Sequence, residues 1–136
     1  MDKLKLEIVT PRGSAFSGEV DEVFMAKGGM GEFGVLAGHA PLLTTLRIGA
    51  FITKTDGKPS YYFVGAGFAE VNQQGMVVLA DSAERAEDID VNRAMAAKQR
   101  AEALLAKKDS EDFAHVQSAL DRAMERIRIA EEHGRK

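Results

Sequence analysis

Charged side chains that could bind an anion recur in the last third of this 136-residue sequence. Asp90 precedes a run of helix-forming residues, and Arg93 and Arg100 follow it seven residues apart, which places both guanidinium groups on one side of a helix. Arg122 and Arg126 are four residues apart and share one side of a second helix. Guanidinium groups pair bidentately with phosphates, and Asp90 could accept a hydrogen bond from a ribose or a base. A helix N-cap and solvated arginines explain the same residues, so the pattern alone leaves both interpretations open.

A histidine in the first third offers a second kind of chemistry. His39 could act as a general base, which requires a nucleophile or substrate within reach and an orienting acid. The sequence contains no cysteine and no Gly-x-Ser-x-Gly elbow, so a structural histidine is favoured and a small hydrolase is the least favoured class. Residues 29–34 match G-x-G-x-x-G, but Gly38 and Pro41 follow and no helical pattern begins. A cluster of turns is therefore favoured over a dinucleotide site.

The composition excludes several classes of protein. The chain has 18 basic and 21 acidic residues, a net charge of −3, so no basic excess predicts a nucleic-acid partner. Disulfides and thiolate metal sites are excluded because cysteine is absent, and three scattered histidines do not suggest zinc. The first residues resemble neither a signal nor a transit peptide, and no apolar run approaches the roughly 20 residues of a membrane helix. We therefore expect a cytoplasmic protein, which could still belong to a membrane complex.

Glycine and proline divide the chain into two parts. Twelve of the 13 glycines lie at or before Gly75, and all three prolines lie in the same part. Beyond Ala80 the sequence becomes rich in alanine and charge. Many short elements are therefore expected first and a few long ones afterwards. We place the boundary between residues 1–86 and residues 87–136.

The first part has the pattern of short strands. Leu4, Leu6 and Ile8 alternate with charged residues, a period of two that gives one buried and one wet face. Asp56-Gly57 between apolar runs and Gly75 after a polar run both predict hairpins. Linked hairpins indicate an all-β antiparallel sandwich or flattened barrel. The strands expected from pattern alone cover residues 3–9, 21–26, 49–54, 61–71 and 75–80.

The second part has the pattern of two amphipathic helices. Each has an apolar stripe at spacings of three and four: Val91, Ala94, Met95, Ala101, Leu104 and Leu105 in the first, and Phe113, Val116, Leu120, Ala123, Ile127 and Ala130 in the second. A short link at residues 107–110 predicts an antiparallel hairpin. Several stripe positions are alanine, which contributes little on burial, so we expect a marginal contact between the helices.

Five segments together carry a resemblance to a known family. They are IVTP (8–11), FSGEVDEV (16–23), GEFGVLAGHAPLLT (31–44), GFAEV (67–71) and VLADSAERAEDID (78–90). Over its whole length the chain resembles the epsilon subunits of bacterial F-type ATP synthases. The resemblance implies an all-β flattened sandwich of about ten strands, followed by a C-terminal antiparallel two-helix hairpin.

The resemblance also implies a function and a set of partners. Such a subunit is a non-catalytic part of the central rotor stalk, peripheral to the cytoplasmic face of the bacterial plasma (inner) membrane, and helps couple proton flow to ATP synthesis. Its sandwich binds the gamma subunit and the c-ring, with Glu32 and His39 expected in that docking region. Its mobile helices reach the catalytic alpha and beta subunits and inhibit ATP hydrolysis.

Some members of this family bind ATP through the motif Ile/Leu-Asp-x-x-Arg-Ala. Residues 89–94 match it in full, through Ile89, Asp90, Arg93 and Ala94. The remaining positions of that site correspond to Glu84, Arg100, Arg122 and Arg126, each of the expected type. The resemblance thus implies no required cofactor and ATP as a regulatory ligand. The alternative function is a stand-alone ATP-binding sensor that needs no partners.

Overall fold

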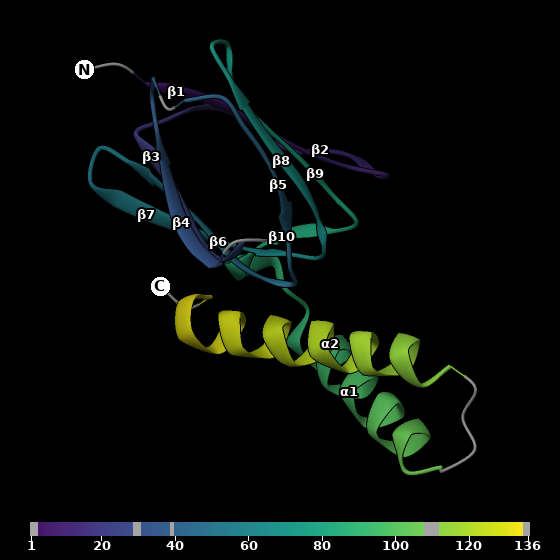
Figure 1. Cartoon of the computed structure of the whole chain (residues 1–136). Helices are drawn as coiled ribbons and strands as arrows, with labels where there is room; N and C mark the ends of the chain where they lie inside the picture. The colour runs from purple at the N-terminus through teal and green to yellow at the C-terminus, as the bar shows by residue number, and fades with distance from the viewer. Residues whose placement is uncertain (1–2, 29–30, 39, 108–111, 135–136) are drawn as a thin grey trace. The chain divides into compact units, whose positions relative to one another are not determined.

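The first strand shows how polar alternation builds the first part of the chain. In β1 (Leu4–Thr10), Leu4, Leu6 and Ile8 are buried while the residues between them are exposed, so the predicted period of two is confirmed. The computed structural model describes residues 3–28, 31–38, 40–107 and 112–134, apart from the side chains of residues 26–28 and 31–33. The chain divides into two compact units after Arg85 (Figure 1), and each unit is described by itself.

Ten strands make up the first unit. After β1 come β2 (Gly13–Val20), β3 (Glu22–Gly28), β4 (Gly31–Leu36), β5 (Leu42–Leu46), β6 (Gly49–Thr55), β7 (Lys58–Val64), β8 (Gly67–Asn72), β9 (Gly75–Ala80) and β10 (Ala83–Arg85). Their hydrogen-bonded order is β10-β7-β6-β3-β5-β8-β9-β1-β2, and β4 pairs with β3 beside this path. Among the described residues, one bridge from Gly28 to Leu46 joins the β4-β3-β6-β7-β10 layer to the β5-β8-β9-β1-β2 layer. The predicted sandwich is confirmed.

The core of this unit lies between the two layers. Apolar side chains from both meet there, including Leu6, Met25, Phe51, Tyr62 and Val78. Tyr62 packs edge-on against Phe51, with ring centroids 6.5 Å apart. Burial of these side chains is the main stabilising contribution to the sandwich.

Two features of the sheet differ from the prediction. The strands are not all antiparallel, because β1 and β9 pair in parallel, with Leu6 beside Met76 and Ile8 beside Val78. This register places buried residues of both strands on the same face. The single strand predicted for residues 61–71 is instead parts of two strands in different layers. The backbone N–H of Gly65 donates a 2.8 Å hydrogen bond to the carbonyl of Ser82, and this bond separates the two strands.

The turns of the first unit follow the predicted glycine chemistry. Asp56 and Gly57 both have positive φ, 53° and 79°, as a two-residue hairpin between β6 and β7 requires. Gly75 has φ 138° in the β8–β9 hairpin, where a Cβ atom would collide with the carbonyl oxygen of Lys5. Both predicted hairpins are confirmed.

The second unit is the predicted pair of helices. A short 3₁₀ turn, η1 (Ala86–Asp88), precedes α1 (Val91–Leu105), and α2 (Phe113–His133) follows. Asp90 is the N-cap of α1, and its Oδ1 accepts a 3.0 Å hydrogen bond from the backbone N–H of Arg93. This N-cap satisfies a donor that the first helical turn leaves without a partner.

The buried seam of the helices is narrower than the predicted stripes. Alanines dominate it: Ala94 and Ala101 in α1, and Ala123 and Ala130 in α2, are at most 6% exposed, together with Val116 at 8%. The predicted stripe residues Met95, Leu104 and Phe113 are instead exposed, at 48%, 45% and 59%. Two helices alone cover only the residues that point directly at each other, so the flanks of each stripe remain in solvent.

Candidate functional site

Four arginines lie on one side of the helical unit. Arg93 and Arg100 each immediately precede a buried alanine of α1, and Arg122 immediately precedes the buried Ala123 of α2. Neighbouring residues differ by about 100° around a helix, so each of these arginines lies about a quarter turn before a buried alanine of the seam. In two antiparallel helices that face each other, the residues a quarter turn before the seam lie on the same side of the hairpin. The arginines of α1 and those of α2 are therefore on one side. We call Arg93, Arg100, Arg122 and Arg126 the arginine face.

The side chains of the arginine face are held to different degrees. Arg93 and Arg100 are exposed, and within the described residues their guanidinium groups make no hydrogen bond or ion pair. Arg122 is half-buried and donates from Nη1 to Oγ of Ser118 over 3.0 Å. Arg126 lies one turn beyond it and is also half-buried. Arg126 has an interaction of its own within the chain, so the charges available to attract a polyanion are those of Arg93, Arg100 and Arg122.

A neighbouring carboxylate on α2 is already matched by another cation. Glu125 accepts two hydrogen bonds from Arg128, 3.1 Å from Nε and 2.7 Å from Nη2, and Glu132 accepts a third over 2.8 Å. The hydrogen bonds with Glu125 are the largest cause of a raised pKa of Arg128. Arg128 thus neutralises part of the acidic charge of α2.

The remaining residues of the predicted nucleotide site have different environments. The carboxylate of Asp90 caps α1, so the N-cap interpretation of this residue is confirmed. Its second oxygen remains able to accept a hydrogen bond from a ligand. Ile89 and Ala94 are buried, at 8% and 4% exposure. Glu84 belongs to β10 of the first unit, so it is not part of the helical unit that carries the arginine face.

The two predicted docking residues lie largely outside the described part of the chain. Glu32 is in β4, and its side chain is not among those that the structure describes. His39 lies outside the described residues. Their role therefore stays a prediction that rests on the resemblance.

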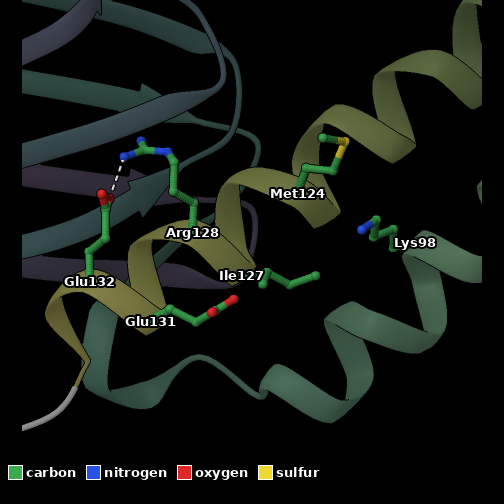
Figure 2. A pocket seen from close by; sticks show the side chains of 6 residues that line it. All are labelled: Lys98, Met124, Ile127, Arg128, Glu131 and Glu132. Carbon is green, nitrogen blue, oxygen red and sulfur yellow. Dashed lines mark hydrogen bonds and ion pairs between the residues drawn. The ribbon is translucent and has the colours of Figure 1, made fainter.

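The helices also form a groove that the sequence did not predict. It has a volume of about 300 Å³ and is lined by Lys98 of α1 and by Met124, Ile127, Arg128, Glu131 and Glu132 of α2. Figure 2 shows Lys98 facing Met124, Ile127 and Glu131 across the groove, while the Arg128–Glu132 ion pair lies to one side. Met124 immediately follows Ala123, whereas Arg122 precedes it, so the groove and the arginine face are on opposite sides of the seam. The sequence pattern does not predict this groove, because the groove exists only when the two helices are packed together.

The described residues contain neither a metal site nor a membrane-spanning helix. Among them, no three His, Cys, Asp or Glu side chains converge in a way that could hold a metal ion. The described helices are also too short or too polar to cross a bilayer.

Comparison with known proteins finds two family models along the chain. Residues 3–86 match the family model described as ATP synthase, Delta/Epsilon chain, beta-sandwich domain. Residues 87–131 match the model described as ATP synthase, Delta/Epsilon chain, long alpha-helix domain.

Individual relatives cover almost the whole chain. The ATP synthase epsilon chain of Nitratidesulfovibrio vulgaris is 52% identical, over 93% of this chain and 94% of that protein. The ATP synthase epsilon chain of Geotalea daltonii is 44% identical, over 99% of each. Among solved structures, a chain of the Euglena gracilis mitochondrial ATP synthase, in an assembly of OSCP, F1 and c-ring, has a TM-score of 0.78 and 25% identity. That match covers 96% of this chain and 82% of the other.

Proposed function

This chain belongs to the delta/epsilon family of ATP synthase subunits, and we propose that it is a non-catalytic rotor subunit whose helices regulate the enzyme. In this role it helps couple proton flow to ATP synthesis and restrains ATP hydrolysis. The proposal includes ATP as a regulatory ligand of the helical unit and no required cofactor.

The regulatory proposal rests on one observation: the arginine face is made by two helices that pack together mainly through alanine side chains. Arg93 and Arg100 come from α1, and Arg122 and Arg126 come from α2. A triphosphate that pairs with guanidinium groups of both helices therefore favours the state in which the helices are packed together. Asp90 and the buried Ile89 and Ala94 are proposed to complete the site at the start of α1, and the role of Glu84 stays a prediction that rests on the resemblance.

We expect the free energy of packing the two helices along the seam to be comparable to the stabilisation that a bound ligand supplies. Alanine side chains bury far less apolar surface than the leucine or isoleucine side chains that contribute about 1.5–3 kcal/mol each. ATP at a hundredfold excess over its dissociation constant stabilises the form that binds it by about 2.7 kcal/mol. Such a ligand is therefore sufficient to shift an equilibrium between packed and separated helices.

The partners are proposed to divide between the two units. The first unit would dock the gamma subunit and the c-ring, and the helices would reach alpha and beta. In support, Phe68 and Leu79 are direct cross-strand neighbours on the outer face of the β5-β8-β9-β1-β2 layer and are each 54% exposed. Leu43, 70% exposed, extends this apolar surface on β5. Exposed apolar surface of this kind is typical of a protein contact. Docking to the c-ring would hold the chain at the cytoplasmic face of the bacterial inner membrane.

Truncation tests the regulatory role directly. The complete catalytic complex is reconstituted with the full chain or with residues 1–88, and ATP hydrolysis is measured in each. Because the first unit has its own core, the short chain should still bind gamma, and hydrolysis should be faster. Equal hydrolysis rates with both chains would contradict the inhibitory role.

Calorimetry tests the ligand. Arg93→Ala should weaken ATP binding roughly 10- to 150-fold, the range for a hydrogen bond to a charged group. Lys98→Ala is the control, since it removes one positive charge from the groove on the opposite side of the seam. Equal losses in both variants would indicate attraction by net charge alone. Tight binding with no effect of the helices on hydrolysis would favour the stand-alone sensor.

A further inference from the structure

Ser118 holds one guanidinium group of the arginine face in place. Its Oγ accepts a 3.0 Å hydrogen bond from Nη1 of Arg122, one helical turn along α2. Both side chains are half-buried. Arg93 and Arg100, in contrast, extend from α1 without a hydrogen-bonding partner among the described residues. Arg122 is therefore more restrained than the exposed arginines of α1.

The hydrogen bond leaves both groups able to bind an anion. A guanidinium group has five N–H donors, and Ser118 engages one of the two nitrogens at its tip. The serine hydroxyl accepts in this bond, so its own hydrogen remains available for donation. A phosphate oxygen on this side of α2 could thus receive hydrogen bonds from Arg122 and from Ser118.

Competing acidic groups on α2 are engaged elsewhere. Asp121, next to Arg122 in sequence, accepts a 3.1 Å hydrogen bond from Gln117. Glu125, three residues beyond Arg122, accepts the bidentate pair from Arg128. The partner that Arg122 has from its own helix is consequently a neutral hydroxyl, which orients the guanidinium without neutralising its charge.

We propose that Ser118 is a positioning residue for Arg122 in a phosphate-binding site on the arginine face. This inference rests on the proposed function, in which ATP binds that face. Restraining Arg122 before the ligand arrives lowers the entropy lost on binding. Ser118 thereby raises the affinity for the phosphates of a nucleotide, although it is not part of the motif that identifies the site.

The test combines affinity with a side-chain measurement on the full chain. ATP affinity is measured by calorimetry for the wild type, Ser118→Ala and Ser118→Thr. Ser118→Ala should raise the dissociation constant roughly three- to tenfold, as expected for one hydrogen bond, and threonine should restore it because it keeps the hydroxyl. Gln99→Ala is the control, because it truncates an exposed polar side chain of α1 and releases no carboxylate beside Arg122.

A double-mutant cycle separates positioning from a general effect on the helix. In an Arg122→Ala background, Ser118→Ala should change the dissociation constant much less than it does in the wild type. Without ATP, NMR of the Arg122 guanidinium should show faster rotation in Ser118→Ala than in the wild type or Gln99→Ala.

The outcomes distinguish the two proposals. Unchanged guanidinium rotation, or an equal loss of affinity in the Arg122→Ala background, would overturn the role of Ser118 while ATP binding stands. A wild-type chain that does not bind ATP would overturn the proposed ligand, and with it the role of Ser118 in binding.

Discussion

Ala123 is the residue at which the seam of the helices can be perturbed most cleanly. Its side chain is 1% exposed, and its neighbours Arg122 and Met124 mark the two sides of the hairpin. Ala123→Leu adds three carbon atoms at a position that is almost completely buried. Overpacking of this kind costs about 1–3 kcal/mol, because side chains or the backbone must shift. The packed state of the helices should lose stability by that amount.

Hydrogen exchange measures this loss in the isolated chain. Since 1.4 kcal/mol corresponds to a factor of ten in an equilibrium constant, the amides of α1 and α2 should exchange roughly 5- to 150-fold faster in Ala123→Leu. Amides of β1, β8 and β9 belong to the other unit and should be unaffected. Saturating ATP should slow exchange in the variant, because it binds the packed state.

A matched substitution shows whether packing is the cause. Ala96 is exposed on α1, so Ala96→Leu adds the same atoms in solvent and should leave exchange nearly unchanged. Equal exchange rates in the wild type and Ala123→Leu would refute the reasoning, since the seam would then have room for a larger side chain. Faster exchange throughout the sandwich would also refute it, because the two units would then not open independently.

Further predictions concern the sandwich. Hydrogen bonds, first from the ammonium of Lys3 at 2.5 Å and then from the backbone of Asp56 at 2.6 Å, hold the pKa of Asp21 below its ordinary 3.8. This interaction therefore stabilises the fold above about pH 3.8 and is lost as the pH falls through the lower folded-state pKa. Asp21→Asn should flatten the stability profile in that acidic range, as denaturant titrations would detect; an unchanged profile would contradict the assignment. Gly75→Ala should lower the melting temperature more than Gly57→Ala, because only at Gly75 does a new Cβ atom meet backbone, whereas Gly57 has open space. Equal shifts would mean that positive φ alone sets the cost.

The parts of the fold that were predicted correctly depend on local patterns. The alternation in β1, the Asp56-Gly57 turn and the N-cap of α1 each involve a few neighbouring residues. The parallel pairing of β1 with β9 joins residues about 70 positions apart, such as Leu6 and Met76, and no local pattern encodes it. The break at Gly65 also depends on a distant partner, the carbonyl of Ser82.

For the candidate site, too, local patterns predicted the features within each helix but not the arrangement of the two helices. Helical spacing alone predicted that Arg93 and Arg100 share a side, as do Arg122 and Arg126. That both pairs flank the same side of the seam required the antiparallel packing of Ala94 and Ala101 on α2. The Ser118–Arg122 bond has an i, i+4 spacing that sequence reasoning could have noticed. Serine at that spacing is common on wet helix faces, so the spacing alone does not distinguish a functional pair.

The exposed stripe residues were the clearest error of pattern reasoning. Met95 and Phe113 have the spacing of core residues, yet a two-helix seam lined with alanine does not reach them. Their exposure leaves apolar surface on the helices, which is compatible with the proposed exchange of partners by this unit.

The central claim is that ATP holds together two helices that otherwise separate. The chain has no cysteine, so cysteines introduced at Ala96 of α1 and Glu131 of α2 can carry spin labels as its only thiols, and both positions are exposed. The distance between the labels is then measured by pulsed electron paramagnetic resonance in the reconstituted complex, with and without ATP. We predict a single short distance at saturating ATP and a second, longer distance without it. One unchanged distance under both conditions would contradict the claim.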